Sequence, residues 1–263
     1  MTKQKPKVLL HIGDLHSGAK SAVACLFDAQ DEDDPPLSPS KRQIELYSKL
    51  KELEASAKQV AKVYGIILVL GADMIEGYHQ HGTNTWGTSD DQRELATRLL
   101  MPFANIATEI YGLLGTETHT GIEGENDKAV VRKLGGIAKQ RFIFDYNGVI
   151  IDCAHHARNT VYPARIAIER SIKEAIKNGD PIPNIIIRHH LHRYDHDERN
   201  FIHGGQVRHI QAAICPCWKL PDPFTRKIAP EQFPDIGALW VYPDEQKIVP
   251  AIYKYRKDNI TKL

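Results

Sequence analysis

One stretch decides the fold: Lys7-Val8-Leu9-Leu10-His11-Ile12-Gly13-Asp14-Leu15-His16. Its apolar run stops abruptly at Gly-Asp-x-His, as a buried parallel strand does when it delivers polar residues into a crevice at its carboxyl end. Asp14 and His16 offer one carboxylate and one imidazole, which can aim at one metal ion if the chain leaves the strand conformation after Gly13. Because this two-residue spacing often arises by chance, its meaning depends on whether other strand ends supply partners.

The composition is that of an ordinary soluble globular protein. The chain has 263 residues, of which 42% are hydrophobic and 25% charged. This length provides ample core for one large α/β domain or two small ones, and with no internal repeat or linker we expect residues 1–263 to form a single domain. The net charge of +1 creates no overall field toward nucleic acid or a membrane surface.

The sequence predicts a cytoplasmic protein. Its four cysteines lack a disulfide-rich pattern, no secretory apolar segment precedes the first strand, and no apolar run approaches membrane-spanning length. The thirteen histidines are many for this length, so residues able to bind metal or transfer protons are the one compositional oddity.

The pattern of strand, glycine and acid repeats in the next segment. Apolar residues recur at three- and four-residue spacing from Lys41 to Tyr64, which predicts a helix that Gly65 ends. The run Ile66–Leu70 is a second buried strand, and it leads into Gly71-Ala72-Asp73-Met74-Ile75-Glu76. A helix between two such strands implies a right-handed parallel crossover.

The remaining elements follow from the same signals. We expect helices over residues 89–106, 126–139 with Asn126 as its cap, and 163–177; buried strands over 109–114 and 184–188; and a hairpin of 141–144 and 149–152 around Tyr146-Asn147-Gly148. Residues 206–214, 236–242 and 247–255 are typical of antiparallel strands, which we expect to close a second sheet.

Two long loops follow the first two strand ends. The acidic, proline-rich centre of the first, residues 31–36, favours a solvated surface loop over a rim of the site. The second loop carries His79, His81 and Trp86, which either line a substrate mouth or form a polar lid without direct chemistry.

Residues that commonly bind metals follow five separate strands. They are Asp14 and His16; Asp73; Glu117, Thr118 and His119; His155 and His156; and His190 and His192. The carboxyl edge of a parallel sheet gathers such residues into one crevice. Asp with several His suits two neighbouring divalent transition metals, Mn, Fe, Zn or Ni, and not the oxygen-rich sites of Mg or Ca.

In this pattern the chain resembles the calcineurin-like metallophosphoesterase superfamily. That family's run of D-x-H, G-D-x-x-[DE], G-N-H, a lone His and G-H-x-H appears here in order between residues 7 and 192. The resemblance implies an α/β fold, a four-layer α/β/β/α sandwich, with two metals at the sheet edge, Mn being expected in vitro. The motif Gly115-Thr116-Glu117 with His119, and the long loop after Asp73, resemble phage-encoded members, which predicts a phage or prophage origin.

The resemblance also implies residue roles. Asp14, His16 and His192 would bind the first metal, and Asp73 would bridge both. His190 and one of His155 and His156 would bind the second metal. His119 would sit over the substrate and stabilise or protonate the leaving oxygen.

The chain departs from the family's pattern at several of its motifs. Ala72 stands between Gly71 and Asp73, and His189 replaces the glycine of G-H-x-H. The expected Asn ligand is missing, so Glu117 could supply an oxygen, or Thr118 a hydroxyl or a place for water. Of the histidine pair we favour His156, because it precedes the small residue Ala157.

Further residues lie near the expected site. Arg158, Arg165, Arg188 and Arg193 could grip phosphate, although surface salt bridges are the commoner role and only Arg193 follows a ligand directly. Asp127, Asp152 and Asp195 could orient ligand imidazoles but are better explained as structural acids. Trp218 could wall the pocket, whereas Cys215-Pro216-Cys217 lacks the second pair that a zinc site needs.

These observations predict a metal-dependent phosphoesterase. Two cations about 3.5–4 Å apart would hold a bridging hydroxide that attacks phosphorus. The small net charge disfavours a processive nuclease, so we expect a phosphodiesterase acting on a cyclic nucleotide or short nucleic acid. The alternatives are a phosphomonoesterase or protein phosphatase, and a non-catalytic metal-binding scaffold. No membrane partner is expected, and the oligomeric state stays open.

Overall fold

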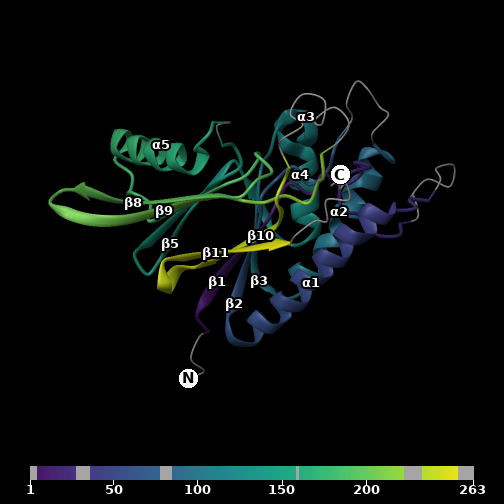
Figure 1. The fold of residues 1–263 in the computed structure, drawn as a ribbon, viewed down its shortest axis with the longest axis horizontal. Coiled ribbons are helices and arrows are strands. Elements are labelled where there is room, and N and C mark those ends of the chain that lie inside the picture. Colours follow the sequence, from purple (N-terminus) through teal and green to yellow (C-terminus); the bar gives the residue numbers. More distant parts are fainter. Residues whose placement is uncertain (1–4, 28–35, 78–84, 158–159, 222–232, 254–263) are drawn as a thin grey trace, which may run out of the picture.

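Two sheets face each other at the centre of this computed structural model, which describes residues 5–27, 36–77, 85–157, 160–221 and 233–253 (Figure 1). The elements are β1 (Lys7–Ile12), α1 (Lys41–Val63), β2 (Gly65–Leu70), α2 (Ser89–Ala104), β3 (Ala107–Leu113), α3 (Glu117–Thr120), η1 (Ile122–Gly124), α4 (Glu125–Lys133), β4 (Ile137–Lys139), β5 (Arg141–Tyr146), β6 (Val149–Ala154), α5 (Pro163–Asn178), β7 (Ile185–Arg188), β8 (Asp195–His203), β9 (Gln206–Ile214), β10 (Ile236–Tyr242), η2 (Pro243–Glu245) and β11 (Lys247–Tyr253).

Both sheets are mixed. The first has the order β11-β10-β1-β2-β3-β4, in which β1 to β4 are parallel and β10 and β11 run antiparallel. The second has the order β5-β6-β7-β9-β8, in which β6, β7 and β9 are parallel. The polar motifs directly follow the carboxyl ends of five strands, which are β1, β2, β3, β6 and β7.

Three hydrophobic clusters define four layers. One lies between α1, α2 and α4 and the first sheet, and includes Leu50 and Leu10. The second lies between the two sheets and joins Leu9 and Val69 to Ile187. The third lies between α5 and the second sheet, and Figure 1 shows α5 on the side of that sheet opposite α1. The predicted α/β/β/α sandwich is confirmed, while a single domain over residues 1–263 stays a prediction.

Local signals placed most elements correctly. Ser40 caps α1 through a capping box with Gln43. The hairpin β5–β6 turns at Asn147 and Gly148, whose φ values of 51° and 85° suit a two-residue hairpin turn.

Three predictions about elements were wrong. The helix expected over 126–139 ends at Lys133, because Gly135 takes a φ of 85° and β4 follows, and Gly124 rather than Asn126 is its cap. β10 and β11 join the first sheet, not the second. The strand β8 was missed because its polar sequence carries no clear alternation, and β9 pairs with β7 in parallel.

Candidate metal centre

Side chains from five strand ends meet where the two sheets come together. The tips are tied by backbone hydrogen bonds, since the Asp14 N–H donates to the carbonyl oxygen of Ala72 and the His16 N–H to that of Asp73, at 3.0 and 2.9 Å. The His189 N–H donates to the carbonyl oxygen of His155 at 2.9 Å. The chain segments that carry the predicted ligands therefore hold one another in place.

The predicted ligands have an unusual backbone conformation. Asp14, His16, Asp73, His190 and His192 have φ values of 51°, 50°, 46°, 78° and 56°. Left-handed conformations are rare for such residues and tend to cluster at functional sites. They turn the chain out of the strand, which is the condition under which Asp14 and His16 can aim at one metal ion.

Four groups of side chains could hold a metal ion, with their ligand atoms within 4.8 Å of one another. The groups are Asp14, His16 and His192; His16, Asp73 and His119; Asp14, Asp73 and His155; and His155, His156 and His190. Because the groups share members, they form one continuous cluster, which we call the ligand cluster. Asp73 and Asp14 lie at its centre and are buried.

Two facing pairs of atoms show that the ligand cluster fits a cation. The His16 Nδ1–H donates to Glu76 at 2.8 Å, which leaves a lone pair on Nε2, yet this atom lies 3.0 Å from Nε2 of His192. The His155 Nδ1–H donates to the Gly71 carbonyl oxygen at 2.7 Å, so its Nε2 faces Asp73 Oδ2 at 3.1 Å, where a proton or a metal ion fits between the two atoms. Two acceptors this close need a proton or a metal ion between them.

Buried polar atoms in the ligand cluster point to the same need. Asp14 Oδ1 and His155 Nε2 are buried and have no hydrogen-bond partner among the described residues. Leaving such atoms unsatisfied costs free energy, and metal coordination would satisfy them. Carboxylate oxygens and neutral imidazoles are the donor set that suits divalent transition metals.

The charges of the ligand cluster also favour a cation. Burial, helped by the Lys219 charge, lowers the pKa of His16 to about 3, so this imidazole is neutral as a ligand must be. At His155 burial acts in the same direction, but contact with Asp73 and the charge of Asp14 outweigh it and raise the pKa to about 9. For Asp73, burial would raise the pKa, but His155 holds it below its ordinary value.

Glu76 and Lys219 support the cluster and were missed as site residues. The buried Glu76 carboxylate accepts from His16 and from Lys219 Nζ, the latter at 2.8 and 2.9 Å. A carboxylate that accepts the second ring N–H of a ligand histidine fixes its tautomer and orientation. Glu76 ends the Asp-x-x-Glu motif and could have been assigned, whereas nothing in the sequence marks Lys219.

The third strand end differs from the prediction. Glu117 and Thr118 are exposed, and among the described residues neither belongs to a ligand group. Instead the Thr116 N–H donates to Asp73 Oδ1 at 2.9 Å, and Thr116 Oγ1 lies 3.2 Å from both carboxylate oxygens. α3 begins at Glu117 and turns this side chain outward, so Thr116, directly after Gly115, is the residue of this strand end that contacts Asp73.

His155 is better placed than His156 as a ligand. His155 is buried against Asp73, while His156 is exposed and belongs only to the group with His155 and His190. The preference for His156 from its position before Ala157 is therefore not supported by the geometry. β6 ends at Ala154, so the first residue after the strand is the one that turns inward.

His119 lies beside the ligand cluster with its tautomer set. Its Nδ1–H donates to the carbonyl oxygen of Glu76 at 2.6 Å, and its ring meets that of His16 edge-on at 4.5 Å. It also belongs to the group with His16 and Asp73. The role that the resemblance implies for His119 stays a prediction.

The predicted substrate residues are not gathered at the cluster. Trp218 is fully buried in the core between the helices and the first sheet, where its backbone N–H donates to Asp14. Trp86 packs edge-on against Phe27, and Arg193 donates to the Thr160 carbonyl oxygen. The expectation that Trp218 walls an open pocket was wrong. His79, His81, Arg158 and most of the acidic loop lie outside the described residues.

The remaining candidates have structural contacts. Asp127 accepts from the N–H groups of Met74 and Gly115 and so ties β2 to β3. Asp195 accepts from Ala164 at the start of α5. Arg188 pairs with Asp152 at 2.6 Å, and Arg165 pairs with Glu169 on the exposed face of α5.

Comparisons with known proteins give a consistent but distant picture. No family model matches the chain, and no curated relative matches it. Among solved structures, the chain is similar to an archaeal phosphodiesterase, with 7% sequence identity, coverage of 94% of this chain and 99% of the other, and a TM-score of 0.46. It is also similar to a metallophosphoesterase from Sphaerobacter thermophilus, with 13% identity, coverage of 95% of this chain and 89% of the other, and a TM-score of 0.42. A predicted phosphoesterase from Streptococcus pneumoniae TIGR4 is also similar, with 11% identity, coverage of 92% of this chain and 83% of the other, and a TM-score of 0.35.

Because the identities and TM-scores are low, the function proposed below rests on the ligand cluster itself. None of the described helices is long and apolar enough to cross a membrane.

Proposed function

We propose that this chain is a phosphoester hydrolase that uses two divalent metal ions. One observation carries the proposal: the ligand groups overlap at Asp14, Asp73 and His155, so a group for one ion continues directly into a group for a second. Asp14, His16 and His192 would hold the first ion, and His155 and His190 the second, with Asp73 between them. Cytoplasmic location and a phage or prophage origin stay predictions.

When bound, the two ions would supply Lewis-acid activation of water and neutralise charge on the phosphoryl oxygens. The chain's own residues do the rest. Glu76 holds the His16 imidazole by its Nδ1–H, and Thr116 holds the Asp73 carboxylate. Because Nδ1 of His119 donates to a carbonyl oxygen, its Nε2 is the nitrogen that would carry a proton to a leaving oxygen.

We propose a phosphodiester as the substrate, a cyclic nucleotide or a short nucleic acid. The net charge of +1 does not suit tight binding of a long duplex. A phosphomonoester or phosphoprotein substrate is the alternative within the same chemistry. A non-catalytic metal-binding scaffold is the alternative from another class.

Hydrolysis of bis-p-nitrophenyl phosphate and of p-nitrophenyl phosphate with Mn²⁺ tests the proposal. We expect turnover of the diester, its loss with a chelator, and a decrease of at least about 1,000-fold in kcat for Asp73→Asn, since the carboxylate shared by both ions is removed. Asp180→Asn, an exposed acid beyond α5, is the matched control and should keep full activity.

Three results would each contradict one part of this proposal. Metal binding without turnover of either ester contradicts an enzyme and supports the non-catalytic scaffold. Faster turnover of the monoester than of the diester contradicts a phosphodiester substrate. Full activity of Asp73→Asn contradicts the use of two ions.

A further inference from the structure

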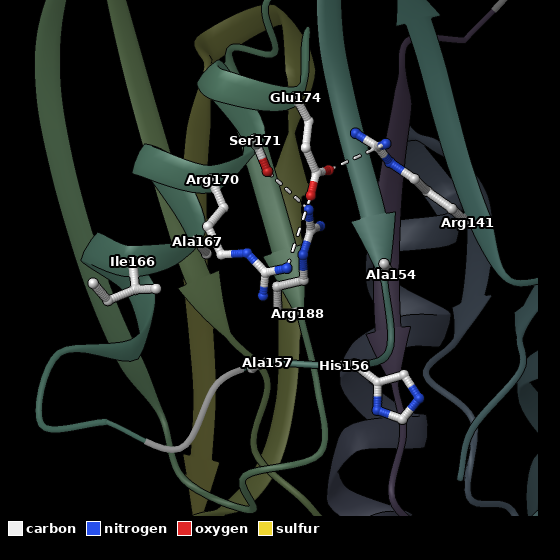
Figure 2. Close-up of a pocket in the computed structure, with 10 residues that line it drawn as sticks. All are labelled: Arg141, Ala154, His156, Ala157, Ile166, Ala167, Arg170, Ser171, Glu174 and Arg188. Atoms are coloured by element: carbon white, nitrogen blue, oxygen red, sulfur yellow. Dashed lines mark hydrogen bonds and ion pairs between the residues drawn. The ribbon is translucent and has the colours of Figure 1, made fainter. Parts of the chain in front are cut away.

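A pocket of about 180 Å³ lies between α5 and the ends of β6 and β7, beside the ligand cluster (Figure 2). Its lining includes three arginines from three elements, Arg141 of β5, Arg170 of α5 and Arg188 of β7. Figure 2 shows their guanidinium groups converging near Ser171 and Glu174. We call this the arginine pocket.

The arginine pocket has more positive than negative charge. Its acidic partners are Asp152, behind the lining, and Glu174. Both Nη groups of Arg188 are used, because they donate to Asp152 Oδ2 at 2.6 Å, to Ser171 Oγ at 2.9 Å and to two backbone carbonyl oxygens. Arg141 donates Nε and Nη2 to Asp152. Three guanidinium groups therefore share two carboxylates.

Two of the arginines have donors left for a ligand. Nη1 of Arg141 is 3.7 Å from Glu174, and Nη2 of Arg170 is 3.9 Å from it. Both distances exceed a hydrogen bond, and Arg170 has no nearer charged partner among the described residues. An anion between Arg141 and Arg170 would take both in charge-assisted hydrogen bonds, for which the planar guanidinium and a phosphate are well matched.

The arginine pocket and the ligand cluster share a wall. Ala154 and Arg188 line the pocket as the last residues of β6 and β7. His155 of the ligand cluster directly follows Ala154, and His190 of the ligand cluster lies two residues after Arg188. His156 also lines the pocket, and its ring lies 5.1 Å from that of His155 and 5.5 Å from that of His190. The His156 ring therefore lies at the boundary between the arginine pocket and the ligand cluster.

We infer that the arginine pocket binds a second phosphate group of the substrate, next to the phosphoester that is cleaved. This inference rests on the proposed function and narrows it to substrates with at least two phosphates, such as a short oligonucleotide with a terminal phosphate. The volume is below the roughly 300–1,000 Å³ of pockets that hold whole drug-sized ligands, so it suits one group of a larger molecule.

Binding of inorganic phosphate to the chelator-treated full chain, measured by calorimetry, tests the pocket without the metal ions. We expect saturable binding that Arg170→Ala weakens about tenfold and that Glu174→Gln strengthens, because the competing carboxylate is neutralised. Arg165→Ala is the matched control, an exposed arginine earlier on α5 that does not line the pocket, and should change nothing. Absent binding, or binding that Arg170→Ala leaves unchanged, overturns the inference.

A kinetic comparison tests the link to the substrate. With Mn²⁺, a dinucleotide carrying a 5′-phosphate should have a lower KM than the same dinucleotide without it, and Arg170→Ala should raise KM about tenfold for the first alone, with kcat unchanged. Equal effects on both substrates overturn the assignment of the second phosphate. If neither dinucleotide nor any aryl ester is hydrolysed while phosphate binding still depends on Arg170, the proposed hydrolase fails and the anion pocket stands.

Discussion

At the scale of single residues, the strand tips depend on glycines that let a histidine come close. His189 is fully buried, and a Cβ atom on Gly71 would lie 2.1 Å from its ring, while one on Gly13 would lie 2.6 Å from its Nδ1. Gly115 likewise leaves room for the Asp73 carboxylate, 2.0 Å from where its Cβ would be. Packing around the ligand cluster therefore requires glycine at positions 13, 71 and 115.

Gly71→Ala should destabilise the chain by about 1–3 kcal/mol or more, because the new methyl group overlaps the His189 ring. Urea unfolding would measure it. Gly65→Ala, at the start of the same strand, is the control, since its Cβ would meet nothing closer than 3.5 Å. If the clash is the cause, adding His189→Ala should recover part of the loss in a double-mutant cycle, and purely additive effects would contradict it.

At the scale of elements, a buried ion-pair network joins the second sheet to α5. Asp152 of β6 accepts from Arg141 of β5, Arg188 of β7 and Ser171 of α5. Burial would raise the pKa of Asp152, but the charges of Arg188 and Arg141 outweigh it and lower the pKa below 3.8. Through Arg188, which lines the arginine pocket, this network also reaches that pocket.

Asp152→Asn should lower the free energy of unfolding at pH 7 by about 3–5 kcal/mol, because Arg188 loses its buried partner. A depressed folded-state pKa gives stability that is present above pH 3.8 and lost as the pH falls through the folded value. The variant should therefore lose less stability than the parent between pH 4 and pH 2, in urea unfolding at a series of pH values. Parallel pH curves would rule out this contribution.

At the scale of the whole molecule, strong local signals in the sequence predicted the converging strand ends, and the resemblance to the calcineurin-like metallophosphoesterases implied the four layers. Buried strands such as Ile66–Leu70 end in glycine, and the residues after them are polar. Since parallel strands of one sheet share one carboxyl edge, the order of β1 and β2 was enough to bring Asp14 and Asp73 together.

The errors arose where tertiary contacts decide. The pairing of β10 with β1 depends on a long-range contact that no pattern within β10 encodes. Thr116 and His155 contact Asp73 in the folded protein, whereas Glu117 and His156 are exposed, and residue type does not encode this difference. Lys219 comes from a segment far along the chain and contacts Glu76 only in the folded protein.

Anomalous diffraction from crystals grown with Mn²⁺ tests the dinuclear centre most directly. We expect two manganese peaks about 3.5–4 Å apart with Asp73 between them, one beside Asp14, His16 and His192 and the other beside His155 and His190. A single peak, or two peaks that Asp73 does not join, would contradict a dinuclear centre in this chain.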